Sequence, residues 1–368
     1  MTSRSKPAKN RNTTIHSVHV AKKNAEATLS LLRKLELLNE RLRIRSVSDH
    51  VLFPLLREAV KTEKRQLQEI DSHRFGEDQF EELARTPRTI EDALAGIVPE
   101  AEYRDLPKSF DIIGDIAVLE VKQESARFEK QMGEAILRVH PNVRTVLAKE
   151  GPISGADRIR PVHHVTGERR TTTIHKEFGC SFKVDLSKAF FSPRLSTEHE
   201  RVATLVGEHE SVVDMFAGVG PFSILIAKTN KQVHVDSIDA NAEAASLMRE
   251  NVHLNKVEGK VRIWNGDARK VTMERLEGTA TRVIMNHPSA AEDFLDSACA
   301  ALAKDRGIIH YYTFMEGDDC EEKAIAELAT GVGIAGYVVE HVLQKRRVRE
   351  VAPYTWQVVV DARVARRA

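Results

Sequence analysis

Residues 212–222 read Val-Val-Asp-Met-Phe-Ala-Gly-Val-Gly-Pro-Phe. The apolar beginning of this stretch predicts a buried strand. Gly218 and Gly220 predict a tight turn, because a residue without a Cβ lets the backbone pass close to a ligand. Pro221 suits the first turn of a helix. We therefore expect a strand, a glycine turn and a helix, with the turn facing a bound molecule.

The strand-and-helix pattern repeats after this stretch. Such alternation is typical of a parallel sheet with helices on both faces. No helix is expected between 337–343 and 356–362, so these two segments are predicted to close the sheet as an antiparallel hairpin. The other strands are expected at 212–216, 233–238, 261–264, 283–285 and 308–312, and the helices at 222–227, 242–254, 290–303 and 321–329.

Acidic residues follow two of these strands. Asp239 comes at the end of the second strand, where a carboxylate can accept hydrogen bonds from both ribose hydroxyls of a nucleoside. Asp267 ends the third strand, a position suited to an adenine edge. The turn is GxG rather than GxGxxG, and no GxxxxGK[ST] phosphate loop is present. A nucleoside site is therefore expected, and the alternative is a packing turn in an unrelated α/β domain.

The string DxFAGxGxF at 214–222 resembles the S-adenosylmethionine loop of class I methyltransferases. The resemblance implies an α/β, Rossmann-like catalytic domain that binds S-adenosyl-L-methionine. It places cofactor contacts on the loop and at the ends of the following strands. By this resemblance the cofactor-binding residues are Asp214, Phe216, Ala217, Gly218, Val219, Gly220, Asp239, Ala240, Asp267, Ala268, Asn286 and Pro288.

A narrower resemblance begins at the end of the fourth strand. Asn286-His287-Pro288 and the later Phe294-Leu295 are similar to the Asn-Leu-Pro…Phe-Leu pattern of the archaeal and eukaryotic tRNA (guanine-37, N1) methyltransferases. Two strings at 175–180 and 190–198 resemble segments that precede the catalytic domain in that family. The resemblance covers most of residues 15–360. His287 stands where the family usually has leucine, so the pocket wall is expected to differ.

This resemblance implies methyl transfer from S-adenosylmethionine to N1 of guanosine 37, next to the anticodon of tRNA. Guanine N1 carries a proton at neutral pH, so a base has to remove it as the methyl group arrives. The family match implies that Glu198 is this base and that His199 contacts the cofactor. The alternative for Glu198 is a carboxylate in a helix capping box. The alternative for His199 is a packed or solvated side chain.

Two further side chains receive catalytic roles from the resemblance. Asn286 is expected to orient the base or the methyl group through its amide, and its alternative is to cap the following helix. An arginine that stabilises charge on guanine O6 precedes Gly167-Glu168 in the family pattern. Arg158 and Arg160 are the candidates, and approximate spacing favours Arg158. Either arginine could instead bind phosphate.

Two smaller α+β modules are expected before the catalytic domain. Residues 1–14 are expected to form a basic disordered arm, and residues 15–65 resemble the tRNA-elbow module of archaeal family members. A charged helical linker at 66–100 leads to an α/β module at 101–190, which is expected to carry tRNA and active-site contacts. The catalytic domain is expected at 191–368.

Local patterns in these modules predict several elements. A strand is expected at 17–21 and a helix at 22–38, whereas residues 57–85 lack strand signals and are predicted as helix or linker. Residues 110–121 form one apolar segment with a glycine break. The remaining strands are expected at 42–44, 50–53, 143–147, 169–174 and 180–184, and a helix at 125–139.

The formal net charge of +1 hides strong segregation along the chain. Residues 1–65 hold 15 basic and 6 acidic side chains, whereas residues 66–135 hold 8 and 17. The basic segment indicates binding to a phosphate backbone, and the alternative is a solvated surface. Basic residues expected to contact tRNA, or to be ordinary surface, are Arg160, Arg169, Arg170, Lys176, Arg194, Lys345, Arg346 and Arg347.

Two other functions remain open at this stage. One is the related aminocarboxypropyl transfer, or wyosine methylation, at the same tRNA position, and the other is RNA binding without catalysis. The chain has no apolar run long enough to cross a membrane, and its three cysteines are far apart. We therefore expect a cytoplasmic protein without a structural metal. The family resemblance implies that it is a monomer and that its partner is the anticodon stem-loop and elbow of tRNA.

Overall fold

The predicted strand-and-helix repeats build a seven-stranded sheet in the order β13-β12-β11-β14-β15-β17-β16. The first five strands of this order pair in parallel, and β17 pairs antiparallel with both β15 and β16. This confirms the expected parallel sheet closed by an antiparallel hairpin. The strands are β11 (Ser211–Asp214), β12 (His234–Asp239), β13 (Val261–Asn265), β14 (Arg282–Met285), β15 (Arg306–Glu316), β16 (Tyr337–Ala352) and β17 (Thr355–Arg366).

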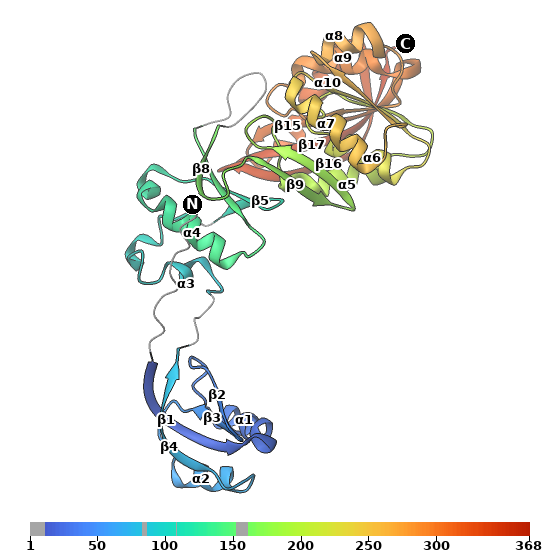
Figure 1. Ribbon diagram of the computed structural model, residues 1–368. Helices are drawn as coiled ribbons and strands as arrows, with labels where there is room; N and C mark the ends of the chain where they lie inside the picture. The colour runs from blue at the N-terminus through green and yellow to red at the C-terminus, as the bar shows by residue number, and fades with distance from the viewer. Residues whose placement is uncertain (1–11, 83–86, 108, 152–160) are drawn as a thin grey trace. The chain divides into compact units, whose positions relative to one another are not determined.

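Helices cover both faces of this sheet (Figure 1). The alternation of side chains along β11 sends Val212 to one buried core and Val213 to the other. The first core contains residues of α5 (Ser196–Leu205), α6 (Pro221–Thr229) and α7 (Ala242–Asn255). The second contains residues of α8 (Ala268–Val271), α9 (Leu295–Ala301) and α10 (Cys320–Ile334). The two layers hold the carboxyl ends of the parallel strands at one open edge.

The structure is a computed structural model that describes residues 12–82, 87–107, 109–151 and 161–368. The chain divides into two units, Met1–Pro87 and Arg88–Ala368. The second unit also contains the sheet β5-β6-β7-β8 and the hairpin β9-β10. Its further elements are α3 (Ile90–Leu94), β5 (Phe110–Ile113), β6 (Ile116–Leu119), α4 (Glu129–Val139), β7 (Thr145–Lys149), β8 (Val162–Gly167), β9 (Thr172–Glu177) and β10 (Cys180–Asp185).

Two details of this module go beyond the sequence-based expectation. The single apolar segment at 110–121 is a hairpin, because Gly114 adopts a φ of +58° between β5 and β6. A Cβ at this position would meet the backbone oxygen of Ile174 at 2.6 Å. Strand β8 was not expected, since only two of its six residues are apolar and most of them are half-buried.

The first unit contains one sheet in the order β2-β3-β1-β4. The prediction of only helix or linker at 57–85 is wrong, because β4 (Arg74–Glu81) pairs antiparallel with β1 (Asn12–Ala21). β4 is an edge strand, so its outer backbone edge and one of its faces are open to solvent. It therefore carries charged side chains and buries mainly Phe80. The other elements are α1 (Ala25–Lys34), β2 (Arg45–Val47), β3 (His50–Pro54) and α2 (Lys61–Gln68).

Some expectations fall on residues 1–11, 83–86 and 152–160, which lie outside the described ranges. They include most of the basic arm and both candidate arginines, Arg158 and Arg160. Across the described ranges, no helix has the length and apolar character needed to span a membrane. In these same ranges, no three His, Cys, Asp or Glu side chains gather as metal ligands would.

Candidate active site

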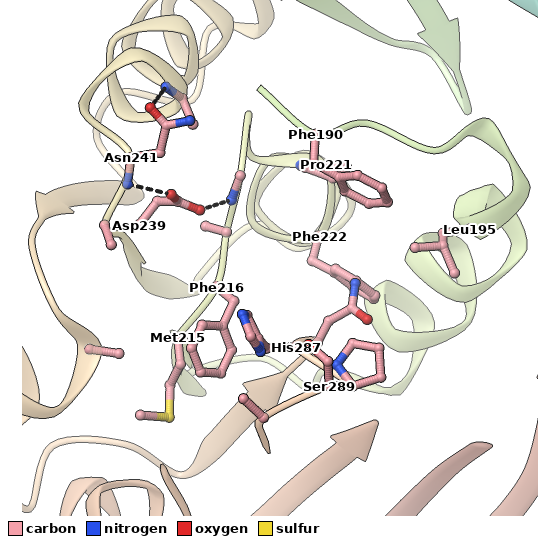
Figure 2. Close-up of a pocket in the computed structure, with 18 of the residues that line it drawn as sticks. Phe190, Leu195, Met215, Phe216, Pro221, Phe222, Asp239, Asn241, His287 and Ser289 are labelled. Carbon is pink, nitrogen blue, oxygen red and sulfur yellow. Dashed lines mark hydrogen bonds between the residues drawn. The ribbon is translucent and has the colours of Figure 1, made fainter. Parts of the chain in front are cut away.

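A cavity of about 420 Å³ lies at the carboxyl ends of β11, β12, β13 and β14 (Figure 2). The cavity therefore occupies the edge of a parallel sheet where α/β proteins usually bind ligands. Most residues that the resemblance assigned to the cofactor line it. These are His199, Phe216, Ala217, Gly218, Val219, Asp239, Ala240, Asp267, Ala268, Asn286 and Pro288.

Asp239 holds the glycine loop and the start of α7 in position. Its Oδ2 accepts a hydrogen bond of 2.6 Å from the backbone N–H of Gly218, and its Oδ1 accepts one of 2.9 Å from the backbone N–H of Asn241. Figure 2 shows the carboxylate between these two backbone groups. Asn241, which was not predicted, caps α7 by accepting from the backbone N–H of Glu243 and Ala244. Its signal was an asparagine directly before a helical run.

Asp267 has a similar capping role at the next strand. Its Oδ1 accepts a hydrogen bond of 2.9 Å from the backbone N–H of Arg269 at the start of α8. The Arg269 guanidinium also contacts this carboxylate and holds the pKa of Asp267 below its usual range. Both acidic groups at the cavity are thus held in place by backbone N–H donors.

Two residues assigned to the cofactor lie beneath the loop instead of at the cavity surface. Asp214 is fully buried and accepts a hydrogen bond of 2.8 Å from Ser223, whose hydroxyl accepts one from Ser237. Burial raises the pKa of Asp214 to about 7. Gly220 adopts a φ of +92°, and a Cβ there would meet Cδ1 of Ile224 at 2.9 Å. The structure thus places both residues under the loop as supports.

Aromatic rings form one wall of the cavity. The centroid of the Phe216 ring lies 4.9 Å from the centroid of the His287 ring. It also lies 4.9 Å from the centroid of the Phe294 ring, and these two rings meet edge to face. The Arg269 guanidinium covers Phe294 at 4.6 Å. His287, which departs from the family pattern, therefore extends this aromatic wall, as Figure 2 shows. Such a wall is suited to a planar ring.

Glu198 does not line the cavity. It is fully buried on α5, and its Oε2 accepts hydrogen bonds from the Tyr312 hydroxyl at 2.9 Å and from Nε of Arg201 at 3.0 Å. Nη2 of Arg346 lies 3.1 Å from Oε1. In the structure α5 begins without a side-chain cap, so the capping-box alternative does not describe Glu198. The carboxylate is instead the centre of a buried ion cluster.

His199, the next residue on α5, does line the cavity. Its Nδ1 lies 2.6 Å from Oε1 of Glu177 on β9. Burial raises the pKa of Glu177, but contacts with His175 and His199 outweigh this effect and bring the pKa to about 2. Glu177 is therefore an ionised acceptor that fixes the orientation of the His199 ring. Sequence analysis missed Glu177, because a glutamate on a half-buried strand gives no local signal.

A second cavity of about 380 Å³ shares walls with the first. The shared residues are Phe190, Phe191, Ser192, Phe314 and Arg349. The second cavity extends toward β5, β6 and β7, where Asp111, Glu120 and Lys149 line it. The hairpin β16-β17 contributes Arg349 and the buried Gln357 to the first cavity, and Gln357 was not predicted as a site residue.

Most of the basic residues predicted to contact tRNA are paired with acidic side chains. Arg170 pairs with Asp115 and Glu168, Arg194 with Asp111, Lys345 with Glu322, Arg346 with Glu198 and Arg347 with Glu321. Arg169 and Lys176 are exposed. Arg160 lies outside the described residues. An RNA phosphate would therefore have to compete with carboxylates for most of these cations.

Three family models match successive parts of the chain. The tRNA methyltransferase 5 N-terminal domain matches residues 17–63, the TYW2 N-terminal domain matches 90–171, and the TRM5/TYW2 methyltransferase domain matches 173–334. These matches agree with the order of modules in the fold, from the four-stranded sheet of the first unit to the catalytic sheet.

Known relatives share most of the chain. A tRNA (guanine(37)-N(1))-methyltransferase Trm5b of Pyrococcus abyssi is 42% identical over 292 residues, which is 78% of this chain and 84% of that protein. The solved complex of aTrm5 and tRNALeu aligns with a TM-score of 0.76 at 30% identity, covering 94% of this chain and 99% of that one. A tRNA(Phe) (4-demethylwyosine(37)-C(7)) aminocarboxypropyltransferase of Pyrococcus horikoshii is 33% identical over 75% of this chain and 96% of its own length. This chain belongs to the TRM5/TYW2 methyltransferase family.

Proposed function

We propose that this protein transfers a methyl group from S-adenosylmethionine to N1 of guanosine 37 in tRNA, with Glu198 as the general base. The observation that carries the proposal is the match of residues 17–63 to the tRNA methyltransferase 5 N-terminal domain. The similarity to Trm5b over 84% of that relative supports the same activity. The aminocarboxypropyltransferase aligns over almost its whole length but over only 75% of this chain. The part without a counterpart is about the size of the first unit, Met1–Pro87.

The chemistry of the cavity fits the cofactor. When bound, S-adenosylmethionine supplies an electrophilic methyl group on a positively charged sulfur. Asp239 presents a carboxylate to ribose hydroxyls, and the Phe216 and His287 rings present an apolar surface to adenine. Asp267 is the polar group beside that surface. The enzyme's contribution is to hold the two reactants in line, because a displacement at carbon is sensitive to orientation.

Glu198 is proposed to accept the proton of guanine N1 as the new bond forms. The family match and its place beside His199, which lines the cavity, support this role. Glu198 itself is held away from the cavity by Arg201, Arg346 and Tyr312. The proposal therefore includes a turn of this carboxylate toward the cavity. The Arg346 side chain is 35% exposed, so an RNA phosphate can reach it and weaken its hold on Glu198.

Glu198→Gln tests the base. The variant removes the proton acceptor but keeps the size of the side chain, so single-turnover methylation should fall by roughly 10²- to 10⁴-fold with the cofactor Kd unchanged. Glu200→Gln is the matched control, because Glu200 is exposed on the same helix. If the two variants had equal rates, Glu198 would not be the base, and the pair of His199 and Glu177 would take its place.

Arg158 is proposed to stabilise the charge that develops on guanine O6 as N1 loses its proton. An oxyanion stabiliser that is removed typically costs about 10²- to 10³-fold in kcat. Arg158→Ala should therefore lower kcat, whereas Arg160→Ala should mainly weaken tRNA binding. The reverse pattern would assign the catalytic role to Arg160.

The second candidate function is aminocarboxypropyl transfer or wyosine-intermediate methylation at the same nucleotide. The match of residues 90–171 to the TYW2 N-terminal domain supports this second candidate. Incubation with labelled cofactor and two tRNA substrates, one with an unmodified G37 and one with 4-demethylwyosine at position 37, followed by nucleoside analysis, separates the functions. We expect 1-methylguanosine, and an aminocarboxypropyl product would refute the methyltransferase.

We further propose that the substrate is held at both its anticodon stem-loop and its elbow by a monomeric protein in the cytoplasm. The first unit supports elbow contact through its similarity to the Trm5 N-terminal domain. Three buried free cysteines, Cys180, Cys299 and Cys320, support a reducing compartment. Sedimentation of the protein with and without tRNA tests the stoichiometry, for which we expect one protein per tRNA.

A further inference from the structure

Gln357 is a polar side chain inside the apolar part of β17. It is 1% exposed, and the residues that follow it, Val358 and Val359, are fully buried. Its Oε1 accepts a hydrogen bond of 2.9 Å from Nε of Arg349. Its Nε2 donates one of 3.2 Å to Oδ1 of Asn286. Gln357 thus connects an arginine to an asparagine, and all three residues line the cavity proposed for the cofactor.

The pairing of strands places these groups opposite each other. Arg349 on β16 is the direct cross-strand partner of Gln357 on β17, next to a register shift between Arg347 and Arg349. Asn286 follows β14 at the carboxyl edge of the sheet. Burial and the nearby Arg194 cation lower the pKa of Arg349, whose guanidinium still carries only donors at neutral pH.

The direction of each hydrogen bond in this chain follows from its arginine. A guanidinium has donors and no acceptor, so Gln357 must present its oxygen to Arg349. The Gln357 amino group then faces Asn286 and donates a hydrogen bond to it, so Asn286 must accept through its Oδ1. The Asn286 amide has only one other polar atom, Nδ2, whose hydrogens remain for a ligand. The oxygen and nitrogen of the Asn286 amide could otherwise exchange positions, but the hydrogen bond from Gln357 fixes which of them faces the cavity.

We propose that Arg349 and Gln357 are positioning residues that make Asn286 a hydrogen-bond donor to the methyl acceptor. The site then selects a base with a ring carbonyl beside the reacting nitrogen and rejects a base with an amino group there. This inference rests on the proposed function, because it names guanine as the base. It deepens that function by assigning selectivity to two residues outside the family motifs.

The reaction explains why a donor is needed. The N1–CH₃ bond forms, the sulfur–methyl bond breaks with its electrons left on sulfur, and the N1 proton passes to the general base. Charge that N1 sheds toward O6 during this step is stabilised by a donor that is already in place. Asn286 neither gains nor loses a proton. An adenine would direct its own amino group at Nδ2, so two donors would face each other and one would lose its partner.

Gln357→Glu is the decisive variant. Its carboxylate still accepts from Arg349 but has no N–H for Asn286, so the Asn286 amide must turn and present oxygen to the cavity. We expect kcat on tRNA with guanosine 37 to fall by about 100-fold, the typical effect of losing a donor to developing charge. The KM for tRNA and the cofactor Kd should stay within about twofold. A purely structural role would alter these binding constants and the Tm as well.

Gln357→Met is the companion variant, because it keeps the side-chain volume and removes both hydrogen bonds. It leaves the Asn286 amide free to adopt either orientation, so its kcat should lie between those of the wild type and Gln357→Glu. In the Asn286→Ala background, Gln357→Glu should have no further effect on kcat, since Gln357 acts through Asn286. If the double variant lost kcat by the product of the two single-variant factors, Gln357 would act independently of Asn286 and the inference would be overturned.

Substrates with altered position 37 give a second readout. Inosine keeps the ring carbonyl and N1–H, whereas adenosine carries an amino group instead. We expect the wild type to methylate inosine 37 far faster than adenosine 37 and the Gln357→Glu variant to narrow this ratio by at least tenfold. A wild type that leaves guanosine 37 unmodified would overturn the proposed function and this inference with it. A wild type that methylates it, beside a Gln357→Glu variant of equal kcat and equal selectivity, would overturn this inference alone.

Discussion

The part of the cavity that we propose for the cofactor, here called the cofactor side, is formed by backbone at the ends of the parallel strands. The charged residues of α5 and of the hairpin β16-β17, which we propose act on the methyl acceptor and its RNA, are here called the acceptor side. On the cofactor side, Asp239 fixes Gly218 and Asn241 before any ligand arrives. On the acceptor side, Glu198 and Arg346 neutralise each other. The first region is therefore preorganised, whereas the proposed function requires the second to exchange partners when RNA binds. Four experiments test this difference.

The largest effect is expected at Asp214, whose burial supports the preorganised loop. Its pKa is about 7 in the folded protein and near 4 in an unfolded chain, so the folded state binds more protons between these values. Stability should therefore fall as the pH rises from about 4 to about 7, by at most about 4 kcal/mol for three pKa units. Asp214→Asn should lose this part of the pH dependence. Urea unfolding at pH 5 and pH 8 measures it, and parallel profiles for the two proteins would contradict the prediction.

Asp239→Ala should weaken cofactor binding by about 10- to 100-fold. The change removes a carboxylate that holds two backbone N–H groups, and hydrogen bonds to charged groups are worth about 1.5–3 kcal/mol. Isothermal titration with S-adenosylmethionine gives the Kd. Asp236→Ala is the control, since Asp236 is a buried carboxylate on the same strand that binds Arg262 and Trp264. Equal losses in both variants would mean that general damage to β12 explains the result.

Deletion of residues 1–87 should weaken tRNA binding by about tenfold and leave the cofactor Kd unchanged. The first unit is compact by itself. The aminocarboxypropyltransferase of Pyrococcus horikoshii aligns over 96% of its own length but over only 75% of this chain, so a related protein can lack about a quarter of the chain. Losing phosphate contacts should also flatten the salt dependence of binding. Filter binding at several salt concentrations measures both. An unchanged salt slope would exclude an RNA role for this unit.

The smallest effect separates an exposed lysine from a paired one. Lys176 is exposed, whereas Lys345 is paired with Glu322 at 2.5 Å. Lys176→Ala should weaken tRNA binding by about threefold and reduce the salt slope by about one unit. Lys345→Ala should have a lesser effect, because RNA binding has to break its ion pair first. If Lys345→Ala had the larger effect, the ion pairs on the acceptor side would not oppose RNA binding.

The fold and the cofactor loop could be predicted from local sequence because their signals are local. An apolar run before GxG is enough to place β11, the turn and α6. Strand β4 was missed, since an edge strand with exposed charges has no apolar alternation to detect. Asp214 and Gly220 were recognised as parts of the loop, but their depth beneath it depends on Ser223 and Ile224 in the following helix.

The acceptor side could not be predicted in the same way, because its contacts join distant segments. The hydrogen bond between Gln357 and Asn286 spans 71 positions of the sequence, and that between Tyr312 and Glu198 spans 114. A family motif could name Glu198 but could not show the cations around it. A single clue was present at Gln357, an uncharged polar residue before three consecutive valines of β17.

Strand β17 lies between β15 and β16 although it follows both in the sequence. During translation, β16 therefore leaves the ribosome before β17, its neighbour in the sheet, has been made. Arg349 and Gln357 lie on these two strands, so they meet only when β17 inserts. The loop at 214–222 and its parallel strands emerge much earlier. A nascent chain thus acquires its cofactor loop first and its means of distinguishing one nucleobase from another last.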